Sequence, residues 1–152
     1  PGRERPRGAL MTTTLAFDDV GVGTTLPELP IPITTTLIVA GALASRDFTA
    51  LHHDKGAAQA GGMQDVFMNI LTTNGLVGRY VSDWAGPSAV VKRVAIKLGA
   101  PNLPGDTMKI TGVVKKKDEA AGTVEVDVAG RNSWGDHVTG TVVVALPRKA
   151  KG

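Results

Sequence analysis

Apolar and polar residues change their spacing along this chain near position 88. Beyond Trp84-Ala85-Gly86-Pro87 the period is two, which is typical of strands that bury one face. The clearest example is 124–128, where valines alternate with acidic residues. Turn residues divide this part of the chain into segments. We therefore predict strands at 88–98, 107–117, 123–132 and 136–146.

The first half of the chain is patterned differently. Apolar residues at 65–81 cover more than one helical stripe, which predicts a long and mostly buried helix with Asp65 as its cap or first-turn anion. The proline-containing segment 23–30 is predicted to be extended. The β-branched run 33–39 predicts a strand, and the Ala-rich stretch 55–60 predicts a short helix.

This order of elements indicates an α+β fold. The economical arrangement is a curved antiparallel sheet wrapped around the long central helix, which is the hot-dog fold. One such unit leaves a sheet edge uncovered, so we expect two units to pair side by side. At 152 residues the chain suits one domain. We assign it to 22–147, with 1–21 as a flexible N-terminal extension, natural or added for expression, and 148–152 as a basic C-terminal tail.

Composition excludes several kinds of function. The chain has no cysteine, which excludes disulfides, thiolate nucleophiles and cysteine metal sites. The net charge of +3 comes from the two ends, and no basic stripe with interleaved aromatics remains between them, so nucleic acid is not an expected partner. The chain shows neither a signal-peptide pattern nor an apolar run of about 18 residues. We therefore expect a cytoplasmic protein without a membrane partner.

The candidate chemistry lies in the segment 44–54, after the predicted strand. Asp47 and His52 place a carboxylate and an imidazole one short turn apart, where both can hold a single water. That is the minimum set for moving protons at neutral pH. A turn-capping aspartate and an ordinary loop histidine are the more common outcome of such a spacing. The rest of the chain favours the chemical interpretation. His53 is expected to point away from His52, and His137 to be structural.

Short motifs along the chain resemble those of the MaoC-like hydratases, hot-dog enzymes that add water to 2-enoyl-CoA thioesters. They run in the same order over about residues 22–147. The motifs are Gly23-x-x-Leu26-Pro27, Asp47-x4-His52-x-Asp54, Thr73-Asn74-Gly75-Leu76-Val77-Gly78, Pro101-x-x-Pro104-Gly105-Asp106-Thr107 and Gly135-Asp136-x-Val138-Thr139-Gly140-Thr141. More narrowly, 46–54, 65–88 and 130–132 resemble the small MaoC-like subunit of actinobacterial hydratases in steroid side-chain degradation.

This resemblance implies an enoyl-CoA hydratase whose substrate is a steroid-CoA thioester with an unsaturated three-carbon side chain. It also implies a second, larger MaoC-like subunit in a heterodimer or heterotetramer. No metal or cofactor is implied beyond the coenzyme A of the substrate. Asp47 and His52 become the catalytic residues, and Asn74 takes a small polar position that faces the pocket. The family's His-Gly pair at the helix start falls on Asp65-Val66, so the Val66 N–H becomes the expected donor to the thioester oxygen.

The sequence also departs from the family pattern, since Arg46 stands where a glycine is usual and Thr49-Ala50 where Asn-Pro is usual. Two other functions remain open. A hot-dog acyl-CoA thioesterase would cleave the thioester, although such enzymes usually carry their acid on the long helix. A non-catalytic hot-dog subunit would only complete a partner's pocket, although such subunits often lack the Asp47 and His52 motif.

Overall fold

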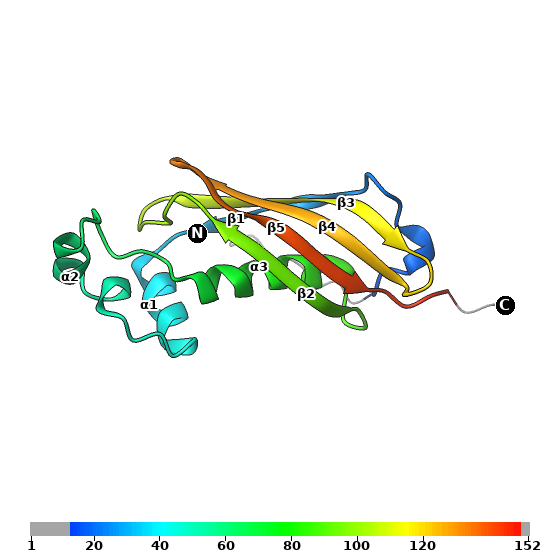
Figure 1. Ribbon diagram of the computed structural model, residues 1–152, viewed down its shortest axis with the longest axis horizontal. Coiled ribbons are helices and arrows are strands. Elements are labelled where there is room, and N and C mark those ends of the chain that lie inside the picture. Colours follow the sequence, from blue (N-terminus) through cyan, green and yellow to red (C-terminus); the bar gives the residue numbers. More distant parts are fainter. Residues whose placement is uncertain (1–12, 150–152) are drawn as a thin grey trace, which may run out of the picture.

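A computed structural model describes residues 13–149 (Figure 1). Five antiparallel strands form one sheet in the order β1-β3-β4-β5-β2. The long helix α3 lies along one face of this sheet (Figure 1), as expected from the sequence. The strands are β1 (Thr25–Pro32), β2 (Val90–Leu98), β3 (Thr107–Asp118), β4 (Thr123–Asn132) and β5 (Gly135–Ala145). The helices are α1 (Thr35–Ala44), α2 (Lys55–Ala60) and α3 (Ile70–Ala85), with the 3-10 turns η1 (Phe17–Asp19) and η2 (Ala50–His52).

The core fills the space between α3 and the sheet. Alternate residues of β4 point inward, and Val124 and Val126 are fully buried. Val77 and Val81 of α3 are also fully buried and belong to the same apolar cluster. The four strands predicted from the period of two are confirmed, and so is the short helix at 55–60.

The strand predicted at 33–39 is wrong, because residues 35–44 form helix α1. Thr34 caps this helix, since its hydroxyl accepts a hydrogen bond from the Leu37 N–H at 3.0 Å. The β-branched threonines therefore mark a helix start. The first strand is instead β1, the segment that the sequence indicated only as extended. It lies at the edge of the sheet, where prolines are tolerated.

The long helix begins five residues later than predicted, at Ile70, and continues to Ala85. Asn69 caps it, because its side-chain oxygen accepts a hydrogen bond from the Thr72 N–H at 2.9 Å. Asp65 lies before the helix and pairs with Lys55 at 2.7 Å. The predicted capping role of Asp65 is therefore wrong, and Asn69 has that role.

Part of the predicted N-terminal extension packs against the domain. Phe17 is fully buried, and its N–H donates a hydrogen bond to the Pro147 carbonyl at 2.8 Å. From the predicted basic tail, Lys149 pairs with Asp19 at 2.5 Å. Residues 1–12 and 150–152 of these two segments lie outside the described residues. Among residues 13–149, no helix has the length and apolar character needed to cross a bilayer.

Helix α1 approaches α3 closely at Gly41. A Cβ atom at this position would overlap the hydroxyl of Thr72, so only glycine fits there without movement. This close approach has a consequence for chemistry, because α1 ends just before Asp47 and α3 begins just after Asn69. The end of one helix and the start of the other are thereby brought together.

Candidate active site

Asp47 lies in a tight turn directly after α1. Ser45 caps the C-terminus of the helix, and Arg46 adopts a left-handed conformation with φ 59°. That backbone region favours glycine, which explains physically why glycine is the usual residue here in the family resembled. The Asp47 N–H then donates to the Ala42 carbonyl at 2.9 Å. The replacement by Arg46 therefore keeps the turn and costs some backbone strain.

His52 follows in η2 and faces Asp47. The two side chains lie 3.3 Å apart, measured from His52 Nε2 to Asp47 Oδ2. The other ring nitrogen, Nδ1, lies 2.7 Å from the Phe67 carbonyl oxygen. A carbonyl can only accept a hydrogen bond, so Nδ1 carries the hydrogen, and the neutral ring keeps a lone pair on Nε2.

This tautomer leaves two hydrogen-bond acceptors facing each other. A carboxylate oxygen and an imidazole lone pair are both acceptors, so Asp47 Oδ2 and neutral His52 Nε2 cannot hydrogen-bond to each other. A water molecule that donates one hydrogen to each satisfies both groups. Once Nε2 takes a proton, the same pair becomes a charge-assisted hydrogen bond. The arrangement is therefore suited to hold a water and then to accept its proton.

Asn69 holds the carboxylate in place. Its Nδ2 donates to Asp47 Oδ2 at 3.0 Å and to Ser45 Oγ at 2.9 Å, and the residue is only 2% exposed. The Thr49 N–H donates to Asp47 Oδ1 at 3.3 Å. These bonds, with that of Asn69 first, hold the pKa of the Asp47 carboxyl below its ordinary value. Asp47 is therefore ionised at neutral pH.

This role of Asn69 was not predicted from the sequence, because the residue fell inside the predicted helix. An asparagine just before an apolar helical run is a common cap signal, and that signal could have identified the true helix start. Its second bond, to Asp47, depends on a contact between residues 22 positions apart. Nothing local in the sequence indicates such a contact.

The pair opens into a cavity of about 510 Å³ between the start of α3 and the adjoining ends of β2 and β5. Its walls are mostly apolar, which is typical of a site that binds an organic ligand. The lining residues are Asp47, His52, Met63, Phe67, Met68, Asn69, Ile70, Leu98, Gly99, Ala100, Pro101 and His137.

Two of the four predicted site residues, Val66 and Asn74, are not among the residues that line this cavity. Val66 is 2% exposed, and its N–H already donates to Asp65 Oδ1 at 2.8 Å. Asn74 is half-buried in the second turn of α3. The structure therefore brings Asp47 and His52 together and places Val66 and Asn74 elsewhere.

The late start of α3 changes which N–H groups can meet a ligand. The residues at the helix start are Asn69 and Ile70, four positions beyond the pair identified from the resemblance. The N–H groups of Ile70 and Leu71 form no hydrogen bond with any described residue, as expected for the first turn of a helix. Ile70 lines the cavity. Its N–H, at the positive end of the helix dipole, is suited to an anionic oxygen.

The buried polar residues of the described chain gather around this cavity. His137 belongs to its wall, although the sequence indicated only a structural role for it. Burial lowers the pKa of His137, so its ring is neutral. His53, by contrast, is exposed, in keeping with the expectation that it points away from His52. The buried polar residues are His52, Asn69, Thr73, Asn102 and His137.

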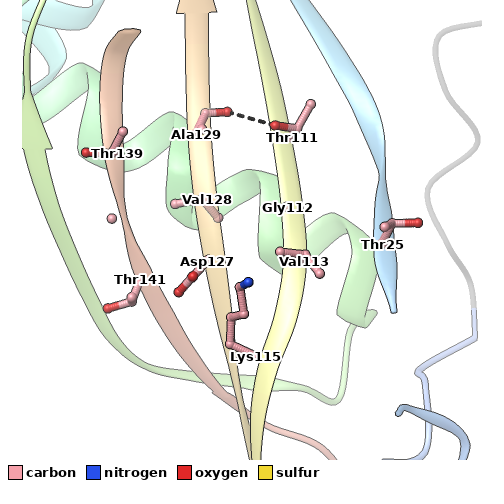
Figure 2. Close-up of a pocket in the computed structure, with 11 residues that line it drawn as sticks. Thr25, Thr111, Gly112, Val113, Lys115, Asp127, Val128, Ala129, Thr139 and Thr141 are labelled. Atoms are coloured by element: carbon pink, nitrogen blue, oxygen red, sulfur yellow. Dashed lines mark hydrogen bonds between the residues drawn. The ribbon is translucent and has the colours of Figure 1, made fainter. Parts of the chain in front are cut away.

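A larger hollow of about 710 Å³ lies on the opposite face of the sheet, with α3 behind the strands (Figure 2). Threonines line much of it, and the Thr111 hydroxyl donates to the Ala129 carbonyl at 3.4 Å. Lys115 and Asp127 are its charged residues, and it contains no histidine. It has a carboxylate but no imidazole beside it, whereas the cavity at Asp47 and His52 has both, so that cavity is the candidate active site.

Comparisons with known proteins agree with this picture. The family model described as "MaoC like domain" matches residues 21–133. The chain is 49% identical, over 125 residues, to the 3-oxo-4,17-pregnadiene-20-carboxyl-CoA hydratase beta subunit of Mycobacterium tuberculosis. That alignment covers 82% of this chain and 95% of the relative.

Solved structures give the same result. A chain in the crystal structure of the ChsH1–ChsH2 complex from Mycobacterium tuberculosis matches with a TM-score of 0.80 and 48% identity, covering 83% of this chain and 98% of that one. The unliganded R-hydratase PhaJ1 from Pseudomonas aeruginosa matches with a TM-score of 0.81 at 18% identity, covering 90% and 88%. The expected hot-dog fold is confirmed. The chain belongs to the MaoC-like domain family.

Proposed function

We propose that this chain is the catalytic small subunit of an enoyl-CoA hydratase, which adds water to the α,β-double bond of a 2-enoyl-CoA thioester. The observation that carries this proposal is the pair of acceptors, Asp47 Oδ2 and His52 Nε2, which lie 3.3 Å apart in an apolar cavity. Two acceptors at that separation fit one water, and the cavity leaves room for an organic substrate beside it.

The reaction begins with the water held by both groups. Its oxygen attacks the β-carbon while one of its protons passes to His52 Nε2. The imidazolium that forms is stabilised by the ionised Asp47 on one side and by the Phe67 carbonyl on the other. General base catalysis of this kind contributes about 10²–10⁴-fold to a rate.

The electron pair of the double bond moves toward the thioester oxygen, which becomes an enolate oxygen. The N–H of Ile70, at the start of α3, is the donor we assign to this oxygen in place of Val66. A donor of this kind contributes roughly 3–4 kcal/mol to the stabilisation of such a transition state. The enolate then takes a proton at the α-carbon from His52 Nε2, on the face that the water attacked. This step restores the neutral imidazole and completes the addition.

Each proton and electron pair in this scheme is accounted for by water, substrate, Asp47 and His52. The reaction as proposed needs no metal and no cofactor other than the coenzyme A that the substrate carries. An acyl-CoA substrate also favours a cytoplasmic site of action.

The substrate class follows from the relatives. The Mycobacterium tuberculosis relative is named as a 3-oxo-4,17-pregnadiene-20-carboxyl-CoA hydratase subunit. At 49% identity over most of both chains, this supports a steroid-CoA thioester with an unsaturated three-carbon side chain as the substrate here. The pathway served would be steroid or cholesterol side-chain degradation.

A second, larger MaoC-like subunit is the proposed partner, in a heterodimer or heterotetramer. The matching ChsH1–ChsH2 structure is a complex of two proteins. The single chain also leaves large apolar side chains exposed beside the catalytic pair, since Phe48 is 66% and Ile70 and Leu71 are each 51% exposed. A partner or a bulky substrate that covers them would remove this apolar surface from water.

The test uses the chain purified alone and together with a larger MaoC-like protein from the same organism. Each sample receives a steroidal enoyl-CoA and a short enoyl-CoA, while enoyl absorbance and free thiol are followed. We expect absorbance to fall without release of thiol, with the steroidal substrate turned over only by the pair. Release of thiol would identify a thioesterase instead. Full activity of the lone chain on the steroidal substrate would contradict the two-subunit assignment.

A further inference from the structure

The two buried polar residues Thr73 and His137 form a bridge that the mechanism above does not use. His137 Nδ1 lies 2.6 Å from the Ala100 carbonyl oxygen, and His137 Nε2 lies 2.8 Å from the Thr73 hydroxyl. Because the carbonyl only accepts, Nδ1 carries the hydrogen. Nε2 of the neutral ring then accepts from the Thr73 O–H, for which the Asn69 carbonyl at 3.4 Å is the more distant acceptor. Both hydrogen-bonding positions of the ring are therefore occupied.

The bridge joins two opposite walls of the cavity. Ala100 lies in the loop after β2, where Gly99, Ala100 and Pro101 form one wall. The start of α3 forms the other wall, and Thr73 lies in the first turn of this helix. The Thr73 N–H donates to the Asn69 carbonyl at 3.2 Å. His137 is 2% exposed and Thr73 is fully buried, so water does not compete for these bonds.

The other hydrogen bonds of loop residues 99–102 among the described residues 13–149 run to the strands or to the segment before α3. The N–H groups of Gly99 and Ala100 donate to the His137 and Asp136 carbonyls, both at 2.8 Å, which fix the loop to β5. The Met68 N–H donates to the Asn102 carbonyl at 3.1 Å, just before α3. Among the hydrogen bonds of the described residues, those of the His137 ring are thus the ones that link the loop wall to the helix itself.

We infer that Thr73 and His137 are positioning residues that set the width of the acyl cavity and thereby its preference for a bulky acyl group. This inference rests on the proposed function, because it takes the ligand of the cavity to be an acyl-CoA. Asp47 keeps its own bonds, from Asn69 and from the Thr49 N–H, when the bridge is cut. Cutting it should therefore change which ligand fits, and not the proton chemistry.

The experiment measures binding of two saturated acyl-CoA thioesters, which cannot be hydrated, to the complex of this chain with its partner. One ligand carries a polycyclic acyl group and the other a four-carbon chain. Thr73→Val removes the hydroxyl at nearly constant volume, and Thr73→Ser, which keeps the hydroxyl, is the matched control. We expect Thr73→Val to weaken polycyclic binding by roughly tenfold and short-chain binding by less than about twofold. Thr73→Ser should leave the ratio of the two affinities unchanged.

A second variant cuts the same bond from the other end. In His137→Asn the side-chain amide can still donate to the Ala100 carbonyl but no longer reaches Thr73. His137→Asn should change the ratio of the two affinities as Thr73→Val does. The double variant should change that ratio little more than either single variant. An affinity ratio that stays constant in these variants, or that shifts toward the polycyclic ligand, would overturn the inference.

One measurement on the unaltered complex covers the case in which the variants fail to fold. Nitrogen NMR of histidine-labelled protein, with the His137 signal assigned through its neighbours, should show this ring neutral, with its hydrogen on Nδ1 and in slow exchange. A charged or rapidly exchanging His137 would refute the bridge. Because the binding ligands are unreactive, a complex that binds them normally but hydrates no enoyl-CoA would refute the proposed reaction and leave the bridge standing.

Discussion

Asn69 Nδ2 lies 3.0 Å from Asp47 Oδ2, and the side-chain oxygen of the same residue caps helix α3. One asparagine thus fixes the start of the helix and the position of the catalytic carboxylate. The two roles are linked, because the cap orients the amide so that its hydrogens point toward Asp47. The position of the carboxylate consequently depends on the start of α3.

Replacing Asn69 should affect catalysis in a way that depends on pH. In Asn69→Ala the hydrogen bond that contributes most to lowering the Asp47 pKa is lost, so that pKa rises. Asp47 must be ionised to hold the water, so the loss of kcat/KM that accompanies protonation of Asp47 should move to higher pH. The rate at neutral pH should fall by roughly tenfold or more, since the carboxylate also loses its position.

The control for this variant is Thr34→Ala, which removes the cap of α1. Each variant should lose about 1 kcal/mol of stability, measured by urea unfolding. Only Asn69→Ala should shift the pH profile. If both variants change the profile alike, the effect comes from a frayed helix and not from the bond to Asp47.

The N–H of Ile70 can be removed without disturbing the helix. Proline is tolerated at the first position of a helix, and Asn69 already has the extended conformation that suits the residue before a proline, with φ −77° and ψ 159°. Ile70→Pro should lower kcat by about 10²–10³-fold. Ile70→Ala keeps the N–H and should lower kcat much less. Equal losses in the two variants would show that the side chain matters and the N–H does not.

The close contact of α1 and α3 predicts that the stability lost by one substitution can be restored by a second. Gly41→Ala places a methyl group on the Thr72 hydroxyl and should cost about 1–3 kcal/mol in the free energy of unfolding. The Thr72 hydroxyl is buried and has no hydrogen-bond partner in the described chain, so Thr72→Ala alone should be nearly neutral.

The double variant Gly41→Ala with Thr72→Ala should recover most of the lost stability. Chemical unfolding of the four proteins gives the interaction energy directly. Additive losses would mean that Gly41 is needed for a reason other than space for Thr72.

Stability at low pH should depend on Asp47. Its pKa in the folded protein lies below the ordinary value of about 3.9. A group of this kind contributes stability above its unfolded pKa, and the contribution is lost as pH falls through the folded pKa. As the pH falls from about 5 to about 2, the Asp47→Asn variant should therefore lose less stability than the unaltered chain.

Urea unfolding at each pH measures this difference. Asp127→Asn is the matched control, because that carboxylate forms no hydrogen bond or ion pair with another described residue. Parallel curves for Asp47→Asn and the unaltered chain would contradict the assigned hydrogen bonds.

The second half of the fold could be predicted from the sequence because its signal is local. In β4, buried valines alternate with outward polar residues, and each strand ends at a recognisable turn. The first half was harder. Thr34 and its neighbours favour a strand by propensity, but the Thr34 hydroxyl caps a helix whose packing depends on Gly41 and Thr72. A tertiary contact therefore outweighs the local preference for a strand.

The same difference between local and distant signals applies to the residues of the site. Asp47 and His52 are close in sequence, and their spacing, read together with the motifs in the rest of the chain, predicted that they meet. Asn69 and His137 join the site through contacts between distant segments, and the helix start that selects Ile70 over Val66 depends on the Asn69 cap. Sequence spacing carries no information on these distances.

The most direct test of the central claim is hydration in water labelled with oxygen-18, by the chain and its partner, with Asp47→Asn and His52→Gln compared with the unaltered complex. We predict one labelled oxygen on the β-carbon of the product, no free thiol, and a loss of about 10²–10⁴-fold in each variant. The double variant should lose little more than either single variant. Near-normal hydration by either variant, or label found in a free carboxylic acid, would contradict the account.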